Sequence, residues 1–288
     1  MPDESFQFKS NSDGLTITAY KWHAANPRAV VVISHGAAEH ALRYERFARE
    51  LNGAGLEAWA MDHRGHGASP GPEGLGDFGQ GGWDALVADI QQVVAMTREA
   101  HPGLPVCLFG HSMGAAAAQQ YAPAWSREID ALILSGSTAR EVPPPGETPV
   151  RADPNAPFEP ARTPYEWLSR DPGEVDKYIA DPLCGFNIWA KRPAMGDPAR
   201  LADPAILSQI RPDLPVLFVA GDMDPINRKL EGLALLETRW RSAGVRQIDK
   251  LYYEGGRHEM LNETNRDEVT ADIIGWLEKN LGFGVSTV

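Results

Sequence analysis

The sequence predicts an α/β protein with a mostly parallel sheet, flanked by helices and interrupted by an insertion. Short runs rich in apolar and β-branched residues recur along the 288-residue chain, and helical patterns lie between them. This alternation is typical of a parallel sheet with helices on both faces. A proline-rich segment breaks the alternation at residues 136–205, which predicts an insertion between two parts of one core.

Seven runs are predicted as strands, and several are apolar throughout, as strands are when both faces of a sheet are covered. The predicted strands are 15–22, 29–34, 56–62, 106–111, 131–135, 216–221 and 250–253. Five helical patterns are predicted at 43–52, 82–101, 114–125, 229–243 and 267–281. Gly282 follows the last of them, as glycine commonly follows a helix end.

The insertion holds 13 of the chain's 23 prolines, a density that excludes long helices and central strands. It also carries large aromatic side chains that must be buried against something, so we expect short folded helices rather than disorder. These aromatics are Phe158, Tyr165, Trp167, Tyr178, Phe186 and Trp189. The predicted division is a core over 1–135, the insertion over 136–205 and the second part of the core over 206–288.

Composition and charge exclude several classes of protein. With 43% hydrophobic residues the chain has the make-up of a folded globular protein. Its 27 Lys and Arg against 39 Asp and Glu give a net charge of −12, the wrong sign for binding nucleic acid or an anionic membrane. The first residues are acidic where a signal peptide is basic, and the aliphatic stretch 29–33 is far too short to span a bilayer. We expect a cytoplasmic protein with no stable membrane insertion.

Metal and disulfide chemistry are not expected. The two cysteines, Cys107 and Cys184, are too few for a disulfide framework and form no sequence motif for zinc. His35, Glu39 and His40 are close in sequence but lack the HExxH spacing of a metal site. The sequence therefore predicts no metal and no cofactor.

A candidate nucleophile lies at the end of the predicted strand 106–111. Gly110-His-Ser112-Met-Gly114 has the GxSxG pattern of a nucleophile elbow, and a helix of small residues follows it. The two glycines remove Cβ atoms that would clash with the neighbouring strand and helix, so the turn can present the serine hydroxyl. The competing interpretation is that Ser112 is an ordinary helix N-cap.

A serine hydroxyl needs a base, and the base needs a carboxylate to orient it. His258 follows the strand 250–253, and Asp222 and Asp224 follow the strand 216–221. Because parallel strands end at the same edge of a sheet, these side chains can converge on Ser112. Asp224 is favoured because Pro225 fixes its loop, with Asp222 as the alternative; the competing interpretation of His258 is a surface histidine.

Two backbone N–H groups are the candidate oxyanion donors. One belongs to Met113, directly after the serine, and the other to Ala37, which follows the strand 29–34. Gly36 allows the backbone to turn the Ala37 N–H inward. Asp62 and Arg64 are expected to play a structural part, forming hydrogen bonds beneath this loop.

These motifs, in this order, resemble the monoacylglycerol lipase and lysophospholipase-like α/β-hydrolases of the serine aminopeptidase group. The similarity is carried by 35–40 with Arg43 and Tyr44, and by 62–69, 110–114, 221–225 and 257–260. The resemblance implies an eight-stranded, mostly parallel sheet with a cap formed by the insertion. It also implies Ser112 as nucleophile, Asp224 as acid, His258 as base, and Ala37 and Met113 as oxyanion donors.

The sequence thus predicts a cofactor-free serine carboxylic-ester hydrolase whose partner is a small acyl ester, such as a monoacylglycerol, a lysophospholipid or a similar single-acyl ester. Trp167, Phe186 and Trp189 are candidate acyl-binding residues of the cap, with plain cap packing as the alternative. An amidase, peptidase, thioesterase or perhydrolase on the same fold is the second hypothesis, because the catalytic residues would be the same. The third is a non-catalytic binding protein.

Overall fold

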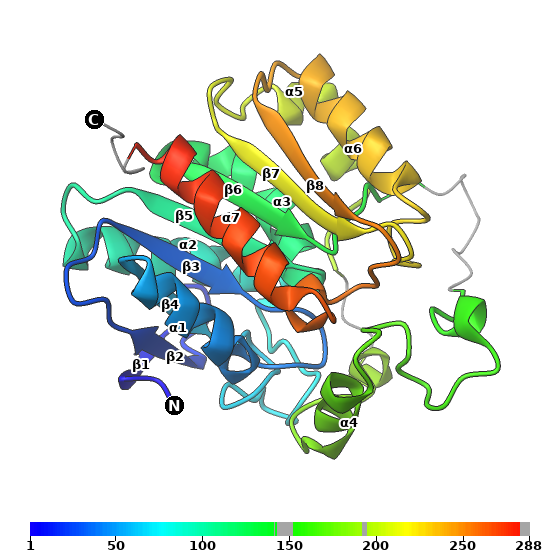
Figure 1. Cartoon of the computed structure of the whole chain (residues 1–288). Coiled ribbons are helices and arrows are strands. Elements are labelled where there is room, and N and C mark those ends of the chain that lie inside the picture. Colours follow the sequence, from blue (N-terminus) through cyan, green and yellow to red (C-terminus); the bar gives the residue numbers. More distant parts are fainter. Residues whose placement is uncertain (141, 143–151, 192–194, 283–288) are drawn as a thin grey trace.

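An eight-stranded sheet forms the centre of the computed structural model, which describes residues 1–140, 142, 152–191 and 195–282. The strand order is β1-β2-β4-β3-β5-β6-β7-β8 (Figure 1). The pairs β1/β2 and β2/β4 are antiparallel and the other pairs are parallel. The strands are β1 (Glu4–Lys9), β2 (Thr16–Trp22), β3 (Ala29–Ser34), β4 (Leu56–Met61), β5 (Val106–His111), β6 (Ala131–Ser135), β7 (Val216–Gly221) and β8 (Ile248–Tyr253). The predicted fold class and all seven predicted strands are confirmed.

The strand whose position was not predicted is β1, at the edge of the sheet. Its sequence is mostly polar, its residues alternate between exposed and half-buried, and it pairs only with β2 within the sheet. Phe6 and Phe8 are its apolar residues, and Phe6 packs edge-on against the Trp59 ring at a centroid distance of 5.8 Å. An edge strand with so few apolar residues lacks the continuous run by which the central strands were predicted.

Five helices cover the two faces of the sheet, at the positions that the sequence predicts. On one face lie α1 (Glu45–Gly53) and α7 (Arg266–Asn280), and on the other α2 (Gly82–Ala100), α3 (Met113–Trp125) and α6 (Glu231–Ser242) (Figure 1). Strand β3 contributes side chains to the hydrophobic core on both faces of the sheet. Val30 and Val32 belong to one core cluster, and Val31 and Ile33 belong to the other. Burial on both faces explains why β3 is apolar from Ala29 to Ile33.

The segment between β6 and β7 contains only short helices in its described parts, as its prolines predict. They are η3 (Ala156–Phe158), α4 (Pro172–Ala180), η4 (Ile188–Lys191), η5 (Arg200–Ala202) and α5 (Pro204–Leu207). Asp171 caps α4 by accepting the Gly173 N–H at 2.9 Å, and Pro172 occupies the first helical position. In Figure 1 α4 lies outside the helix-covered sheet. We call this segment the cap; its boundaries at 136 and 205 stay predictions.

The remaining short helices are η1 (Ala41–Tyr44), η2 (Ser126–Glu128) and η6 (Met260–Asn262). Within the described part of the chain, no helix combines the length and apolar character needed to cross a bilayer.

Candidate active site

Ser112 stands on a strained turn between β5 and α3. Its φ of 50° and ψ of −109° lie where non-glycine residues rarely occur, and its N–H donates to the Ser135 carbonyl at 2.9 Å. The neighbouring glycines are required by close packing: a Cβ on Gly110 would lie 2.7 Å from the Gly114 carbonyl oxygen, and one on Gly114 would lie 2.1 Å from the Ser34 carbonyl oxygen. The Ser112 side chain makes no capping hydrogen bond to α3, which argues against the N-cap interpretation.

His258 and Asp224 meet beside His111, the residue that precedes Ser112. The His258 Nδ1 atom lies 2.9 Å from the Asp224 Oδ2 atom, and the residues are 2% and 0% exposed. Asp224 Oδ1 also accepts the Ile226 N–H at 2.8 Å, which fixes the carboxylate in its loop. Asp222 instead accepts the Gly255 N–H at 2.7 Å and joins two loops. The structure therefore brings Asp224, not Asp222, to His258, and it buries a histidine that could have been a surface residue.

Electrostatics favour proton uptake by His258. Burial lowers its pKa, but the charge of Asp224 and the hydrogen bond to it outweigh burial, so the pKa is raised above the ordinary 6.5. The neighbouring His111 ring, at a centroid distance of 4.8 Å, behaves in the opposite way. Burial and the nearby His258 lower the pKa of His111 to about 4, so His111 stays neutral at physiological pH.

Gly136 lets the loops of the site approach one another, and the sequence reasoning missed it. It follows β6 directly and has a φ of +55°. A Cβ at this position would lie 2.9 Å from His111 Cε1 and 3.1 Å from His258 Nδ1. The sequence signal that could have identified Gly136 is its position directly after a buried strand. Its absent side chain allows His258 to pack beside the residue that precedes Ser112.

The loop after β3 passes beside Ser112, as the oxyanion prediction requires. A Cβ on Gly36 would lie 3.3 Å from the Ser112 Cβ atom. Among the described residues, no acceptor lies within hydrogen-bonding range of the Ala37 N–H. Met113 is the first residue of α3, where backbone N–H groups have no partner within the helix. Both predicted donors are therefore available, beside the serine and at a helix N-terminus that favours negative charge.

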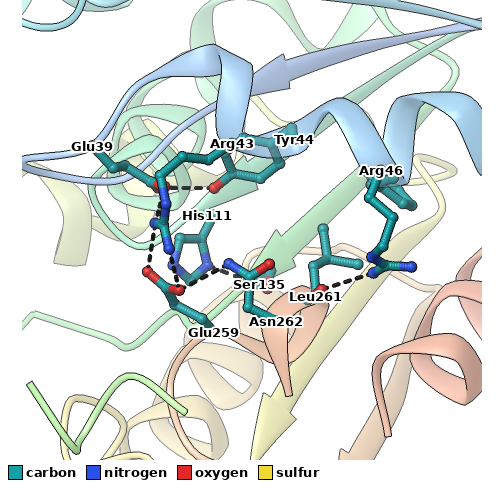
Figure 2. A pocket seen from close by; sticks show the side chains of 10 residues that line it. Glu39, Arg43, Tyr44, Arg46, His111, Ser135, Glu259, Leu261 and Asn262 are labelled. Atoms are coloured by element: carbon teal, nitrogen blue, oxygen red, sulfur yellow. Dashed lines mark hydrogen bonds and ion pairs between the residues drawn. The ribbon is translucent and has the colours of Figure 1, made fainter. Parts of the chain in front are cut away.

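A buried ionic network supports this loop and was not predicted. The Arg43 guanidinium donates to Glu39 at 2.6 Å and to both Glu259 oxygens at 2.7 Å (Figure 2). Glu39 in turn accepts the Gly36 N–H at 2.5 Å and the Tyr44 hydroxyl at 2.9 Å. Burial acts to raise the pKa of Glu39, but the charge of Arg43 outweighs it and lowers that pKa. The network links the Gly36 loop to the residue that follows His258.

A small cavity lies against this network, with a volume of ≈ 20 Å³, enough for a single water molecule. His111 and Ser135 also line it, beside Glu259 of the ionic network (Figure 2).

The three aromatic residues proposed from the sequence as acyl-binding residues have different surroundings. The Trp167 ring packs on the His258 ring at a centroid distance of 4.9 Å, and its carbonyl accepts the His258 N–H at 3.3 Å. Phe186 packs on the His66 ring at 5.3 Å and is partly buried against the core. The side chain of Trp189 lies outside what the structure describes. Of the two whose side chains the structure describes, Trp167 is the one in contact with His258.

The structural part expected of Asp62 and Arg64 is confirmed, but the expected position beneath the loop after β3 is right for Asp62 and wrong for Arg64. Asp62 lies beneath the loop and accepts the Ala41 N–H at 2.8 Å. Arg64 is fully buried but pairs elsewhere, with Asp89 at 2.9 Å and Asp13 at 2.8 Å. A buried guanidinium needs carboxylate partners, and these come from α2 and the turn before β2, not from the loop after β3.

Fold and site together define a serine hydrolase of the α/β-hydrolase class. A family model described as "Serine aminopeptidase, S33" matches residues 25–265, so the chain belongs to this family, as its motifs suggested.

Two named relatives match nearly the whole chain. A monoacylglycerol lipase of Mycolicibacterium smegmatis is 33% identical over 273 residues, which cover 89% of this chain and 90% of that protein. The monoglyceride lipase of Rattus norvegicus is 32% identical and covers 95% of this chain and 89% of its own length. Among solved structures, a thermostable carboxyl esterase from Bacillus coagulans superposes with a TM-score of 0.81 at 24% identity, covering 98% of this chain and 99% of that one. The chain is therefore similar along nearly its whole length to monoacylglycerol lipases, and it shares the fold of a carboxyl esterase.

Proposed function

We propose that this enzyme hydrolyses monoacylglycerols, lysophospholipids or similar single-acyl esters through Ser112, His258 and Asp224. The observation that carries the proposal is the buried 2.9 Å contact between His258 and Asp224 beside the strained turn of Ser112. Monoacylglycerol is placed first because relatives that match nearly the whole chain carry that name.

In the proposed reaction His258 removes the proton of the Ser112 hydroxyl as the oxygen attacks the ester carbonyl. The N–H groups of Ala37 and Met113 donate hydrogen bonds to the carbonyl oxygen and stabilise the negative charge that develops on it. When the tetrahedral intermediate collapses, protonated His258 gives its proton to the departing alcohol and an acyl-enzyme remains. Water, deprotonated by His258, then attacks the acyl group, and the fatty acid leaves as Ser112 regains its proton.

Asp224 orients the His258 ring and stabilises its positive charge during both steps. Trp167 covers the ring from the cap side, which keeps water away from the His258–Asp224 contact and strengthens it. The same position makes Trp167 the first candidate to meet the acyl chain, followed by Phe186. The partner is thus a small acyl ester and not nucleic acid, and a cytoplasmic location stays an expectation from the sequence.

A substrate panel tests this proposal. Wild type and Ser112→Ala would be assayed on 1-monoacylglycerols of several chain lengths, on lysophosphatidylcholine, on p-nitrophenyl esters, on an acyl thioester and on aminoacyl anilides. We expect the highest kcat/KM on monoacylglycerol and no turnover by Ser112→Ala. Higher kcat/KM on anilides or thioesters would instead support the amidase or thioesterase alternatives, and equal turnover by Ser112→Ala would contradict the mechanism.

A further inference from the structure

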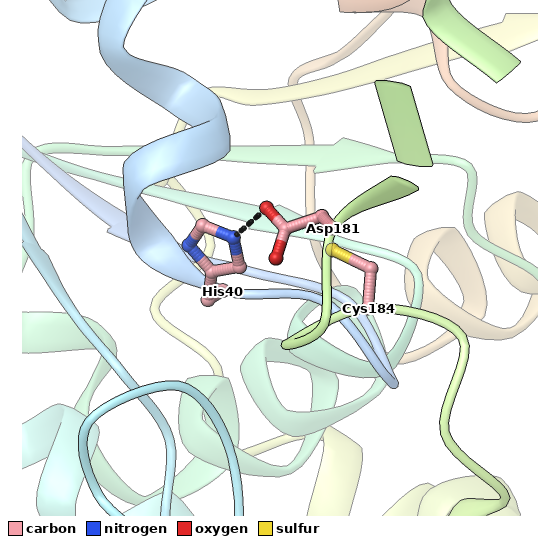
Figure 3. Close-up of side chains that lie close together, drawn as sticks. All are labelled: His40, Asp181 and Cys184. Atoms are coloured by element: carbon pink, nitrogen blue, oxygen red, sulfur yellow. Dashed lines mark hydrogen bonds and ion pairs between the residues drawn. The ribbon is translucent and has the colours of Figure 1, made fainter. Parts of the chain in front are cut away.

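Three side chains of types that can bind a metal ion lie close together where the cap contacts the core. His40 comes from the loop after β3, and Asp181 and Cys184 come from the cap segment after α4 (Figure 3). Their ligand atoms all lie within 4.8 Å of one another, and His40 Nε2 lies 2.8 Å from Asp181 Oδ2. Asp181 and Cys184 are three residues apart, but His40 is 141 residues away from Asp181, so no local sequence motif indicates the complete cluster.

The donor set is selective for a particular kind of cation. A thiolate, an imidazole and a carboxylate together suit Zn²⁺, whereas Mg²⁺ and Ca²⁺ prefer oxygen ligands alone. With zinc-to-ligand distances of about 2.0–2.3 Å, the ligand atoms of a tetrahedral site lie about 3.3–3.8 Å apart. The His40–Asp181 separation of 2.8 Å is shorter than that spacing and no separation exceeds 4.8 Å, so small side-chain adjustments would bring all three atoms to one ion.

Charge around the cluster also favours a cation. The charged groups that act on the Cys184 thiol are one cation, Arg43, and three carboxylates, those of Asp181, Glu39 and Glu259. His40 is 6% exposed, so its ring is held in place and largely shielded from solvent. A divalent ion would therefore enter a partly buried site of net negative charge, with a rigid imidazole already turned toward its carboxylate.

We propose that His40, Asp181 and Cys184 form a zinc-binding site that fastens the cap to the loop after β3. On binding, Zn²⁺ replaces the proton of the Cys184 thiol, which is released to solvent, and takes the place of the contact between His40 and Asp181. The three side chains are the protein ligands and water completes the tetrahedron.

The site's position connects it to catalysis. Tyr178 and Gly185, which flank the two cap ligands in sequence, donate to the Ala38 carbonyl at 3.0 and 2.9 Å. Ala38 is held at a φ of 54° and follows the proposed oxyanion donor Ala37. Zinc that fixes the cap here would resist any cap movement that substrate entry requires, so bound zinc would inhibit hydrolysis; this second part rests on the proposed function.

Metal binding tests the site without reference to activity. Metal-free full-length protein would be titrated with Co²⁺, which gives a thiolate-to-cobalt charge-transfer band, and then with Zn²⁺ in competition with a chromophoric chelator. Cys184→Ala is compared with Cys107→Ala, which removes the other thiol from the core. We expect the cobalt band in wild type and in Cys107→Ala only, and a loss of zinc affinity in Cys184→Ala of about 100-fold or more, beyond the loss typical of outer-shell changes.

Asp181→Asn is the second variant, since it keeps the shape of the side chain while removing its charge, and circular dichroism checks that each variant is folded. Equal zinc affinity in wild type, Cys184→Ala and Asp181→Asn would overturn the site. Zinc binding with unchanged ester hydrolysis would overturn the inference that zinc fixes the cap and inhibits hydrolysis. Zinc binding by a protein that hydrolyses no ester would support the site and contradict the proposed function instead.

Discussion

The backbone of Ser112 is strained, and the packing of its neighbours maintains this conformation. Its positive φ is kept by β5 on one side and α3 on the other, whose contact leaves no room for side chains at Gly110 and Gly114. Such conformations persist only where the surroundings enforce them, and they gather at functional sites. The strain at Ser112 therefore supports a chemical part for this residue.

A glycine substitution tests this packing. Gly114→Ala would place a Cβ 2.1 Å from the Ser34 carbonyl oxygen, so α3 or β3 must shift. We expect the free energy of unfolding to fall by about 1–3 kcal/mol, and kcat to fall because Ser112 moves with the turn. Chemical denaturation and ester hydrolysis measure the two effects. Gly275→Ala is the matched control, since its Cβ meets nothing within 4 Å in α7, and there we expect a stability gain of about 0.5–1 kcal/mol.

The pair His258–Asp224 predicts a pH dependence. The base must be neutral to act, and Asp224 raises the pKa of His258, so kcat/KM of the wild type should fall as pH drops below a midpoint that lies above 6.5. Asp224→Asn removes the charge that raises this pKa, so the midpoint should move to lower pH while kcat at neutral pH falls by about 10⁴-fold. Asp222→Asn is the control, with an unchanged midpoint. A midpoint that moves in Asp222→Asn and not in Asp224→Asn would reverse the assignment.

At the scale of elements, Glu263 joins the cap to the loop that carries His258. The carboxylate is fully buried and accepts the Arg170 side chain at 2.8 Å and the Arg257 N–H at 2.9 Å. A backbone hydrogen bond also connects the cap to this loop, since the Glu259 N–H donates to the Leu168 carbonyl at 2.8 Å. The cap is thus part of the structure that places the base, in addition to any part in substrate choice.

Removing the Glu263 carboxylate should therefore loosen both elements. In Glu263→Ala, the partly buried donors of Arg170 and Arg257 lose this acceptor, and we expect a loss of about 1–3 kcal/mol in stability together with a lower kcat. Thermal unfolding and ester hydrolysis are the measurements, with the exposed Glu99→Ala as control. Identical unfolding temperatures and rates for the two variants would show that Glu263 holds neither the cap nor the loop.

Elements with a strong local signal could be predicted, and contacts made through space could not. Strands such as β3 and β5 are apolar along their length because both faces are covered, whereas β1 has one neighbour and few apolar residues. The same distinction applies to the site. The order of Ser112, Asp224 and His258 and their positions after strands can be read from the sequence. The packing of Trp167 on His258 depends on how the cap folds back, which no local pattern encodes.

At the scale of the whole molecule, the net charge of −12 should decide which form of a lipid ester the proposed activity reaches. An acidic surface is repelled by anionic bilayers, so contact with such membranes should be weak at low ionic strength. Dispersed single-chain esters, or esters in uncharged surfaces, carry no such barrier.

Salt should therefore change activity on one kind of surface only. For a monoacylglycerol embedded in phosphatidylserine-rich vesicles, we expect hydrolysis to rise several-fold as salt is increased, because the screening length falls from about 30 Å at 0.01 M to about 10 Å at 0.1 M. In phosphatidylcholine vesicles the rate should change little. A rate on anionic vesicles that is highest at low salt would instead indicate a basic docking surface and contradict this account.

The central claim is that Ser112 is the nucleophile, and covalent labelling tests it most directly. Wild type, Ser112→Ala and the exposed control Ser12→Ala would be treated with a fluorophosphonate and their masses measured, with the adduct located by peptide mapping. We predict one adduct per chain on the peptide that contains Ser112, the same adduct in Ser12→Ala, and none in a folded Ser112→Ala. An adduct at another residue, or undiminished labelling of Ser112→Ala, would contradict the claim.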